Sequence, residues 1–221
     1  MEFDLSLVTS SLPLLLQGAL VTLEITALAV GLGLVFGLIA ALAQLSKFSF
    51  LRLLAKIYVD FIRGTPLLVQ IFIIYFALPV IVGHRIDPFV AAVAACSINS
   101  GAYVAEIFRA GIQSIEIGQM RAGLSLGMNW SMTMRYIILP QAFKRIIPPL
   151  GNEFIAMLKD SSLVSVIGFE ELTRSGQLII AETYGSLEIW STVAVLYLVM
   201  TLTITRLVSL LEKKFRASDA R

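Results

Sequence analysis

The sequence predicts an all-α, polytopic membrane protein with about five transmembrane helices. Of its 221 residues, 57% are hydrophobic and only 14% are charged, whereas soluble domains average roughly 45–50% apolar and about 25% charged residues. One transmembrane helix needs about 20 mostly apolar residues, so this apolar content suffices for five. The same composition argues against an ordinary cytosolic enzyme and against a disordered or nucleic-acid-binding chain. We therefore expect residues 1–221 to form a single transmembrane domain.

The candidate spans are five apolar stretches separated by polar segments. They cover approximately residues 18–45, 67–82, 89–107, 146–168 and 189–211. Residues 57–62 extend the second stretch backwards into one tilted helix, and residues 83–88 are expected to form the turn that follows it. Small polar segments interrupt the third stretch at residues 99–101 and the fourth at residues 159–162. Four or six spans are the alternatives, because residues 146–168 are ambiguous.

The positions of the basic residues predict the orientation of these spans. Lys and Arg accumulate in short cytoplasmic loops. If the amino terminus lies outside, the cytoplasmic segments are residues 46–63, 109–145 and 206–221. Those segments then hold every Lys and Arg of the chain except Arg85, Lys159 and Arg174. We therefore expect five spans with the amino terminus outside and the carboxyl terminus in the cytoplasm.

The longest expected cytoplasmic loop, residues 109–145, is amphipathic and too polar to cross the membrane. Residues 119–126 have a helical pattern, and Gly127 follows as a C′ stop. A second helical run covers residues 131–139 and is expected to end at Pro140. Two short helices joined by a glycine could form a protrusion that docks a partner. The alternative is a helix pair that lies flat on the lipid headgroups.

The acidic residues of the fourth stretch are candidate substrate ligands, because ionisable groups inside a membrane are costly and usually face a cavity or a partner. Glu153 and Asp160 are seven residues apart, which puts them on one helix face about 10 Å apart along the axis. Two acceptors there could hold an ammonium group or a cationic side chain. Alternatively, Asp160 pairs with Lys159 or caps the helix, and Glu153 pairs with an arginine of the inner loop.

Breaks in the fourth stretch would free backbone groups for a ligand. Gly151 follows two prolines, and the polar run from Asp160 through Ser161 and Ser162 interrupts the apolar pattern before Leu163. We expect these last four residues to belong to the substrate site.

Three polar residues in other stretches are further candidates. Asn99 and Ser100 could donate to a substrate carboxylate, or could instead hydrogen-bond between helices. Glu24 is the one charged residue of the first stretch, and it would favour a cationic substrate if it faces the cavity. Glu106 and Arg109 are three residues apart and are expected to pair within one helix.

The loop carries a motif that identifies a family. The coupling loop of the integral membrane subunits of ATP-binding-cassette importers has the pattern Glu-Ala-Ala, three residues, Gly, nine residues, Ile, one residue, Leu-Pro. The same spacing occurs here over Arg121-Ala122-Gly123, Gly127, Ile137 and Leu139-Pro140. The chain differs at the first and third positions of the pattern, where Arg121 replaces the glutamate and Gly123 replaces an alanine.

Four other segments resemble the polar amino-acid uptake permeases of that class. They are Arg63-Gly-Thr-Pro-Leu-Leu-Val-Gln70, Ala102–Ile112, Leu139–Ala142 and Lys159–Ile167. The resemblance covers nearly the whole chain, and it implies a permease subunit in the bacterial cytoplasmic (inner) membrane. It further implies pairing with a second permease copy or a sister chain, an extracytoplasmic substrate-binding protein, and ATPase subunits that dock on the loop.

The chain has no Gly-x-x-x-x-Gly-Lys-[Ser/Thr] run, so it lacks a phosphate-binding loop. We therefore expect it not to be an enzyme, and expect the partner ATPase to bind ATP and Mg. Its single cysteine, Cys96, excludes an internal disulfide and a multi-cysteine metal site. The excess of acids within the spans favours arginine, lysine or histidine as substrate, with glutamine, glutamate or another polar amino acid as the alternative. More remote alternatives are a stand-alone secondary transporter, which would need internal repeats, and an ion channel, which would need a pore-lining ring.

Overall fold

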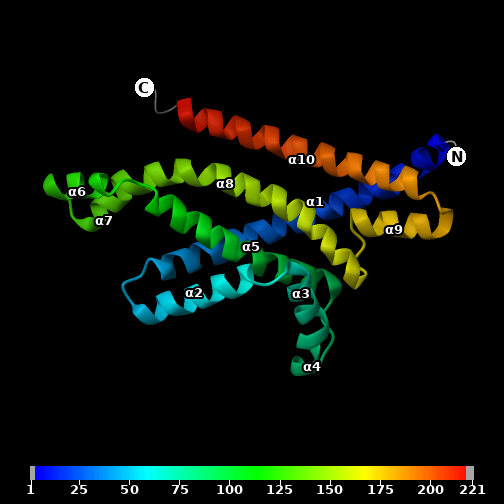
Figure 1. Cartoon of the computed structure of the whole chain (residues 1–221), viewed down its shortest axis with the longest axis horizontal. Helices are drawn as coiled ribbons and strands as arrows, with labels where there is room; N and C mark the ends of the chain where they lie inside the picture. Colours follow the sequence, from blue (N-terminus) through cyan, green and yellow to red (C-terminus); the bar gives the residue numbers. More distant parts are fainter. Residues whose placement is uncertain (1–2, 218–221) are drawn as a thin grey trace.

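The computed structural model describes residues 3–217, and within them all regular secondary structure is helical. Figure 1 shows an elongated bundle in which the longest helices run side by side along the molecule. The elements are α1 (Leu5–Gln44), α2 (Ser49–Arg63), α3 (Leu67–Phe72), the π-helix η1 (Ile73–Ala77), α4 (Leu78–Val82), α5 (Pro88–Gln113), α6 (Ile117–Ser125), α7 (Trp130–Thr133), the π-helix η2 (Met134–Ile138), α8 (Leu139–Asp160), the 3₁₀-helix η3 (Ser161–Ile167), α9 (Leu172–Thr183) and α10 (Ser186–Ala217).

Helix α1 begins at Leu5, well before the start predicted at residue 18. Asp4 caps it, because its Oδ1 accepts hydrogen bonds from the N–H groups of Ser6 at 2.8 Å and Leu7 at 3.2 Å. The Ser6 hydroxyl also donates to this carboxylate, and these bonds hold the pKa of Asp4 below its usual range. The apolar pattern marks the membrane-crossing part of α1, whereas the cap determines where the helix starts.

Small residues allow α1 and α5 to approach closely. A Cβ placed on Gly33 would lie 2.9 Å from the Oγ of Ser100, and one on Gly37 would lie 2.5 Å from Val104 Cγ1. Ala102 and Ala105 are fully buried beside them. Between apolar helices in a membrane, close packing rather than the hydrophobic effect drives association, and small residues make that packing available. This contact forms the centre of the bundle.

The second predicted span is not one tilted helix, and that prediction is wrong. Helix α2 and the segment formed by α3, η1 and α4 meet at an angle of 105°. Pro66 disfavours the helical conformation for the residue before it, and its own ψ is extended at 138°. The segment α3–α4 therefore points away from the bundle (Figure 1).

The predicted interruption of the third stretch is also wrong, because α5 is continuous from Pro88 to Gln113. Asp87 caps this helix with hydrogen bonds from Phe89 N–H at 2.9 Å and Val90 N–H at 3.2 Å. The predicted turn at residues 83–88 is confirmed, and Gly83 there has a φ of +78°. Polar side chains need not break a helix when neighbouring helices supply their partners.

Helix α8 differs from the prediction at its start and in its middle. Pro140 in the predicted loop does not end a helix, and α8 continues through it, through Pro148 and Pro149, and through Gly151 to Asp160. The π-helix η2 ends at Ile138, two residues before Pro140, and such a turn adjusts the backbone pairing where proline offers no N–H. The break after Asp160 is confirmed as a change to the 3₁₀-helix η3.

Within the described residues, three helices are long and apolar enough to cross a membrane, namely α1, α5 and the Ser186–Lys213 part of α10. The bent pair of α2 with α3–α4 would be a fourth span if it is counted as one. Helix α8 falls outside this group because it carries five charged residues: Lys144, Arg145, Glu153, Lys159 and Asp160. It nevertheless runs along much of the bundle beside α5 (Figure 1).

A buried carboxylate joins α9 to α1 and α10. Glu171 is fully buried and caps α9 by accepting from Thr173 N–H at 2.9 Å and Arg174 N–H at 2.8 Å. It also accepts from the hydroxyls of Tyr197 on α10 at 3.0 Å and Thr22 on α1 at 3.4 Å. One side chain therefore satisfies donors from three helices.

We expect Glu171→Ala to lower the thermal midpoint of the purified protein by roughly 5–10 °C, because it removes a helix cap and leaves buried donors unpaired. Thermal unfolding in detergent measures this shift. Glu170→Ala is the matched control, since Glu170 is exposed. Equal midpoints for the two variants would show that the Glu171 contacts add no stability.

Candidate functional site

A pocket of about 410 Å³ lies where the α2–α3 bend meets α5 and the end of α8. Its walls come from segments far apart in sequence, and the bend supplies most of them. The lining residues are Arg63, Gly64, Thr65, Pro66, Leu67, Asn99, Tyr103, Asp160 and Leu163. It therefore contains three of the residues predicted for the substrate site: Asn99, Asp160 and Leu163.

Arg63 provides a cation on one side of this pocket. Its guanidinium carbon lies 5.3 Å from the centroid of the Tyr103 ring, within the range of a cation–π contact. Its Nη1 lies 3.9 Å from Glu106, which also pairs with Arg109 as predicted. Arg63 was predicted to lie in a cytoplasmic loop, but the 15 residues of α2 separate it from the α1–α2 turn, a distance of roughly 22 Å.

Asp160 provides the acidic group of the pocket. It is the last residue of α8 and its side chain is exposed. Among the described residues, no ion pair joins Asp160 to Lys159, whereas Glu106 pairs with Arg63 and Arg109. The alternative of an ion pair between Asp160 and Lys159 is therefore not realised, and the carboxylate is accessible from the pocket.

Gln70 holds the bend in shape and orients Asn99. Its Nε2 donates to the carbonyl of Ile62 at 2.8 Å and to the carbonyl and hydroxyl oxygens of Thr65 at 3.1 and 3.0 Å. Its Oε1 accepts from Asn99 Nδ2 at 3.0 Å. One N–H of the Asn99 amide is thus engaged with Gln70, which leaves its second N–H as a donor and its carbonyl oxygen as an acceptor for a ligand.

The other predicted substrate residues lie outside this lining. Ser100 donates to Glu153 at 2.9 Å, so both residues join α5 to α8 and both are buried. Ser161 is fully buried and donates to the carbonyl of Leu158 at 2.9 Å. Ser162 is half-buried, and Glu24 is exposed on α1. The predicted acidic stripe of Glu153 and Asp160 is therefore divided between an interhelical hydrogen bond and the pocket.

Sequence reasoning did not assign Arg63, Thr65, Tyr103 and Gln70 to the site. Three of them belong to the Arg-Gly-Thr-Pro-Leu-Leu-Val-Gln segment, which ends an amphipathic helix and turns at a proline. A charged residue directly before a turn inside an otherwise apolar region was the available signal. The role of Gln70 required the structure, because its partners come from both sides of the bend.

The α6–α7 hairpin projects from the end of the bundle opposite to the amino terminus (Figure 1). Helix α6 ends as predicted at Gly127, which has a φ of +82°. Gly127 N–H donates to the Leu124 carbonyl at 3.1 Å, and Met128 N–H donates to the Gly123 carbonyl at 3.1 Å. These two bonds form a Schellman motif.

Gly123 sits where α6 packs on the returning chain, because a Cβ there would lie 2.6 Å from Thr133 Cγ2 and 3.2 Å from Ile137 Cδ1. Arg121 and Ala122 point outwards, whereas Ile137 and Leu139 are half-buried. Large apolar side chains are exposed on the hairpin, with Leu126 at 81%, Ile117 at 69% and Trp130 at 58%. Such a patch on a protrusion is typical of a surface that binds a partner.

Comparison with known proteins agrees with this architecture. The family of binding-protein-dependent transport system inner membrane components matches residues 33–217. The chain belongs to this family. Its polytopic helical fold, its inner-membrane location and its resemblance to the polar amino-acid permeases are thereby confirmed.

Two similar proteins are named as permeases of amino-acid transport systems. The glutamine transport system permease protein GlnP of Escherichia coli (strain K12) is 48% identical over 217 residues, which cover 98% of this chain and 99% of that protein. The arginine transport system permease protein ArtQ of Bacillus subtilis (strain 168) is 39% identical over 219 residues, covering 99% of this chain and all of that one.

Solved permeases share the fold. A crystal structure of an amino acid ABC transporter with histidines has a TM-score of 0.93 and 48% identity, and covers 97% of this chain and 100% of that one. An inward-facing MetNI methionine ABC transporter has a TM-score of 0.76 at 19% identity, covering 92% of this permease and 97% of that chain. The second match supports the fold alone.

We expect Gln70→Leu to reduce transport by this permease about tenfold, because it removes the hydrogen bonds that join Asn99 to the bend and that bind the carbonyl groups of Ile62 and Thr65. Uptake by the permease assembled with its ATPase measures the loss. Gln17→Leu is the matched control, since Gln17 is exposed on α1. Normal uptake by Gln70→Leu would show that the bend keeps its shape without these bonds.

Proposed function

We propose that this permease forms the translocation path for a polar α-amino acid whose side chain ends in N–H donors, with arginine, lysine or histidine as the first candidates. The observation that carries the proposal is that Arg63 and Asp160 line the same pocket. An α-amino acid presents a carboxylate and an ammonium group. The guanidinium can bind the carboxylate with charge-assisted hydrogen bonds, and the aspartate can bind the ammonium group.

Asn99 is a further polar group of the pocket and is compatible with a side chain that donates. It offers a carbonyl oxygen as an acceptor, while one N–H of its amide is bonded to Gln70. An ammonium, guanidinium or imidazole N–H satisfies such an acceptor. The names of the similar arginine permease and of the similar transporter solved with histidines support a basic amino acid.

Glutamine is the second candidate. The similar permease from E. coli is named for glutamine, and the side-chain amide of glutamine also carries N–H donors. The sequence favoured a cationic substrate because three acids lie within the apolar stretches. Only Asp160 of these acids lines the pocket, since Glu153 is bonded to Ser100 and Glu24 lies outside the lining. Glutamate fits less well, because its carboxylate would approach Asp160.

The topology proposed for the chain is five spans with the amino terminus outside. The fold is compatible with this count if α8 crosses beside α5 and the bent pair is one span. The α1–α2 turn, the α6–α7 hairpin and the described end of α10 lie toward the same end of the molecule (Figure 1). These are the segments rich in Lys and Arg, so a single cytoplasmic face accounts for the charges.

The partners proposed are those of the family. The hairpin within residues 109–145 would dock the ATPase, which binds ATP and Mg, through the segment Arg121, Ala122, Gly123, Gly127, Ile137, Leu139 and Pro140. Because Arg121 is exposed where the family pattern has a glutamate, the cleft of this ATPase would have to tolerate a positive charge. A second permease copy or a sister chain and an extracytoplasmic binding protein would complete the importer.

Uptake from reconstituted vesicles tests the proposal. The permease is assembled with its ATPase and binding protein and is supplied with labelled arginine, lysine, histidine, glutamine and glutamate. ATP-dependent uptake of a basic amino acid supports the first candidate, and uptake restricted to glutamine supports the second. A preference for glutamate would contradict the role given to Asp160 and Asn99, and uptake without ATP would contradict the assignment as an importer subunit.

A further inference from the structure

We propose that a groove between α1 and α2 binds an anionic phospholipid, with an acyl chain in the groove and the phosphate at a basic cluster at its closed end. The groove has a volume of about 440 Å³. Phe36, Ile39, Ala40 and Ala43 line it from α1, Leu51, Leu54, Ala55 and Tyr58 from α2, and Ile98 from α5. It lies outside the substrate pocket, and the two share no lining residue.

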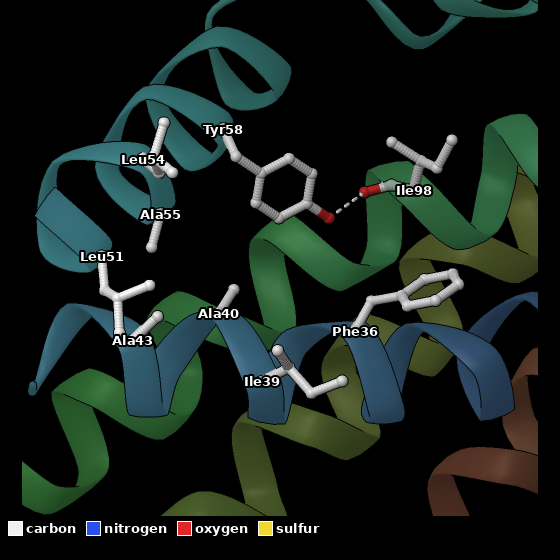
Figure 2. Close-up of a pocket in the computed structure, with 9 residues that line it drawn as sticks. All are labelled: Phe36, Ile39, Ala40, Ala43, Leu51, Leu54, Ala55, Tyr58 and Ile98. Carbon is white, nitrogen blue, oxygen red and sulfur yellow. Dashed lines mark hydrogen bonds between the residues drawn. The ribbon is translucent and has the colours of Figure 1, made fainter.

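The lining fits a hydrocarbon chain. Figure 2 shows α2 side chains on one side and α1 side chains on the other, with Tyr58 as the one polar side chain. The Tyr58 hydroxyl donates to the Ile98 carbonyl at 2.7 Å, so the groove presents no unpaired hydroxyl. On α1 the lining extends from Phe36 to Ala43, which corresponds to roughly 10 Å along the helix axis.

Selectivity must come from the headgroup, because an acyl chain is as well solvated by other lipid tails as by a protein groove. Lys47 lies in the turn that closes the groove, and Arg52 and Lys56 directly follow the lining residues Leu51 and Ala55. Arg52 and Lys56 are four residues apart and so share one side of α2. All three cations are exposed.

The charge at the turn end of the groove is of one sign, because residues 25–59 contain no Asp or Glu. The nearest acid is Asp60 on α2, one helical turn beyond Lys56 and farther from the α1–α2 turn, and no ion pair joins it to Lys56 within the described residues. The guanidinium of Arg52 donates to the Ser46 carbonyl at 3.4 Å, which keeps it near the turn. Basic groups between membrane helices at the membrane surface attract phosphate headgroups. The cluster therefore complements an anionic lipid.

A second copy of the chain is the less favoured occupant. In a two-fold interface the same surface faces itself, so Lys47, Arg52 and Lys56 would approach their own counterparts. Three cations on each copy against the one acid Asp60 on α2 would leave an excess of like charge, which opposes association. A lipid phosphate instead neutralises the cluster.

Native mass spectrometry of the full-length permease with phosphatidylglycerol and phosphatidylcholine of identical acyl chains tests the inference. We expect phosphatidylglycerol to be retained preferentially by the wild type. Arg52→Gln with Lys56→Gln should reduce that preference about tenfold. The matched control removes two exposed basic charges elsewhere, by Arg206→Gln with Lys213→Gln, and should leave it unchanged.

Variants that fill the groove with a large side chain test whether the acyl chain binds there or whether surface charge alone retains the lipid. Ala43→Trp should lower phosphatidylglycerol retention, and Ala27→Trp on an exposed position of α1 should not. Ile39→Trp replaces Ala43→Trp if the latter lowers the thermal midpoint. Equal retention of the two lipids by the wild type would overturn the proposal. So would equal loss in both charge variants, or groove-filling variants that disrupt self-association without changing lipid retention.

Discussion

Asp160→Asn is expected to reduce uptake of a basic amino acid by about 10- to 100-fold while the assembled complex forms in normal amounts. A charge-assisted hydrogen bond contributes about 1.5–3 kcal/mol, and each 1.4 kcal/mol corresponds to a factor of about ten. Asp160 is the one acid that lines the pocket, and no ion pair with Lys159 engages it within the described residues. The asparagine keeps the shape of the side chain but cannot attract an ammonium group as strongly.

Uptake of labelled substrate by reconstituted vesicles measures this effect, and size-exclusion chromatography checks assembly. Asp60→Asn is the matched control, because Asp60 is an exposed aspartate on α2 that does not line the pocket. If Asp160→Asn transports normally, Asp160 does not bind the substrate. If both variants lose uptake equally, the effect of the substitution is not specific to the pocket.

Several local features of the fold could be predicted because they depend on neighbouring residues. The turn at residues 83–88, the Gly127 stop, the Glu106–Arg109 pair and the change of helix type after Asp160 all agree with the structure. Each follows from one residue's backbone preference or from a spacing of three residues. The pattern of apolar residues therefore predicted where the helices lie. The backbone preferences of single residues predicted where several of them end.

Helix breaks were predicted less well, because polar residues and prolines inside apolar stretches have two interpretations. Asn99 and Ser100 do not interrupt α5, since Gln70 and Glu153 on other elements satisfy them. Pro140 is accommodated by the preceding π-helix, whereas Pro66 does produce a bend. The outcome depends on contacts between distant segments, which a single sequence does not show.

The candidate site shows the same limit. The sequence identified Asp160 and Asn99, but it grouped Glu153 and Glu24 with them because all are polar residues in apolar stretches. Arg63 was assigned to a loop, although it lines the same pocket as Asp160. Once the positions are known, the balance of charge at the pocket changes from an excess of acids to one acid and one cation, which matches the two ends of an amino acid.

Gly127→Val is expected to abolish the coupling of ATP hydrolysis to transport. Gly127 has a φ of +82°, a conformation that is strained for a β-branched residue by about 1–3 kcal/mol or more. The strain would disrupt the Schellman motif that joins α6 to α7, and would displace the exposed surface around Leu126 and Trp130. We expect uptake to fall more than tenfold, with ATPase activity that no longer responds to substrate.

Two variants separate this effect from backbone strain alone. Gly127→Asn should retain coupling, because asparagine tolerates the left-handed conformation better than other non-glycine residues do. Gly83→Val introduces the same kind of strain at a φ of +78° in the turn after α4, far from the hairpin in sequence. It should lower stability without uncoupling ATP hydrolysis from transport. If Gly127→Val stays coupled, or if Gly83→Val uncouples equally, the α6–α7 hairpin is not the surface that receives the movement of the ATPase.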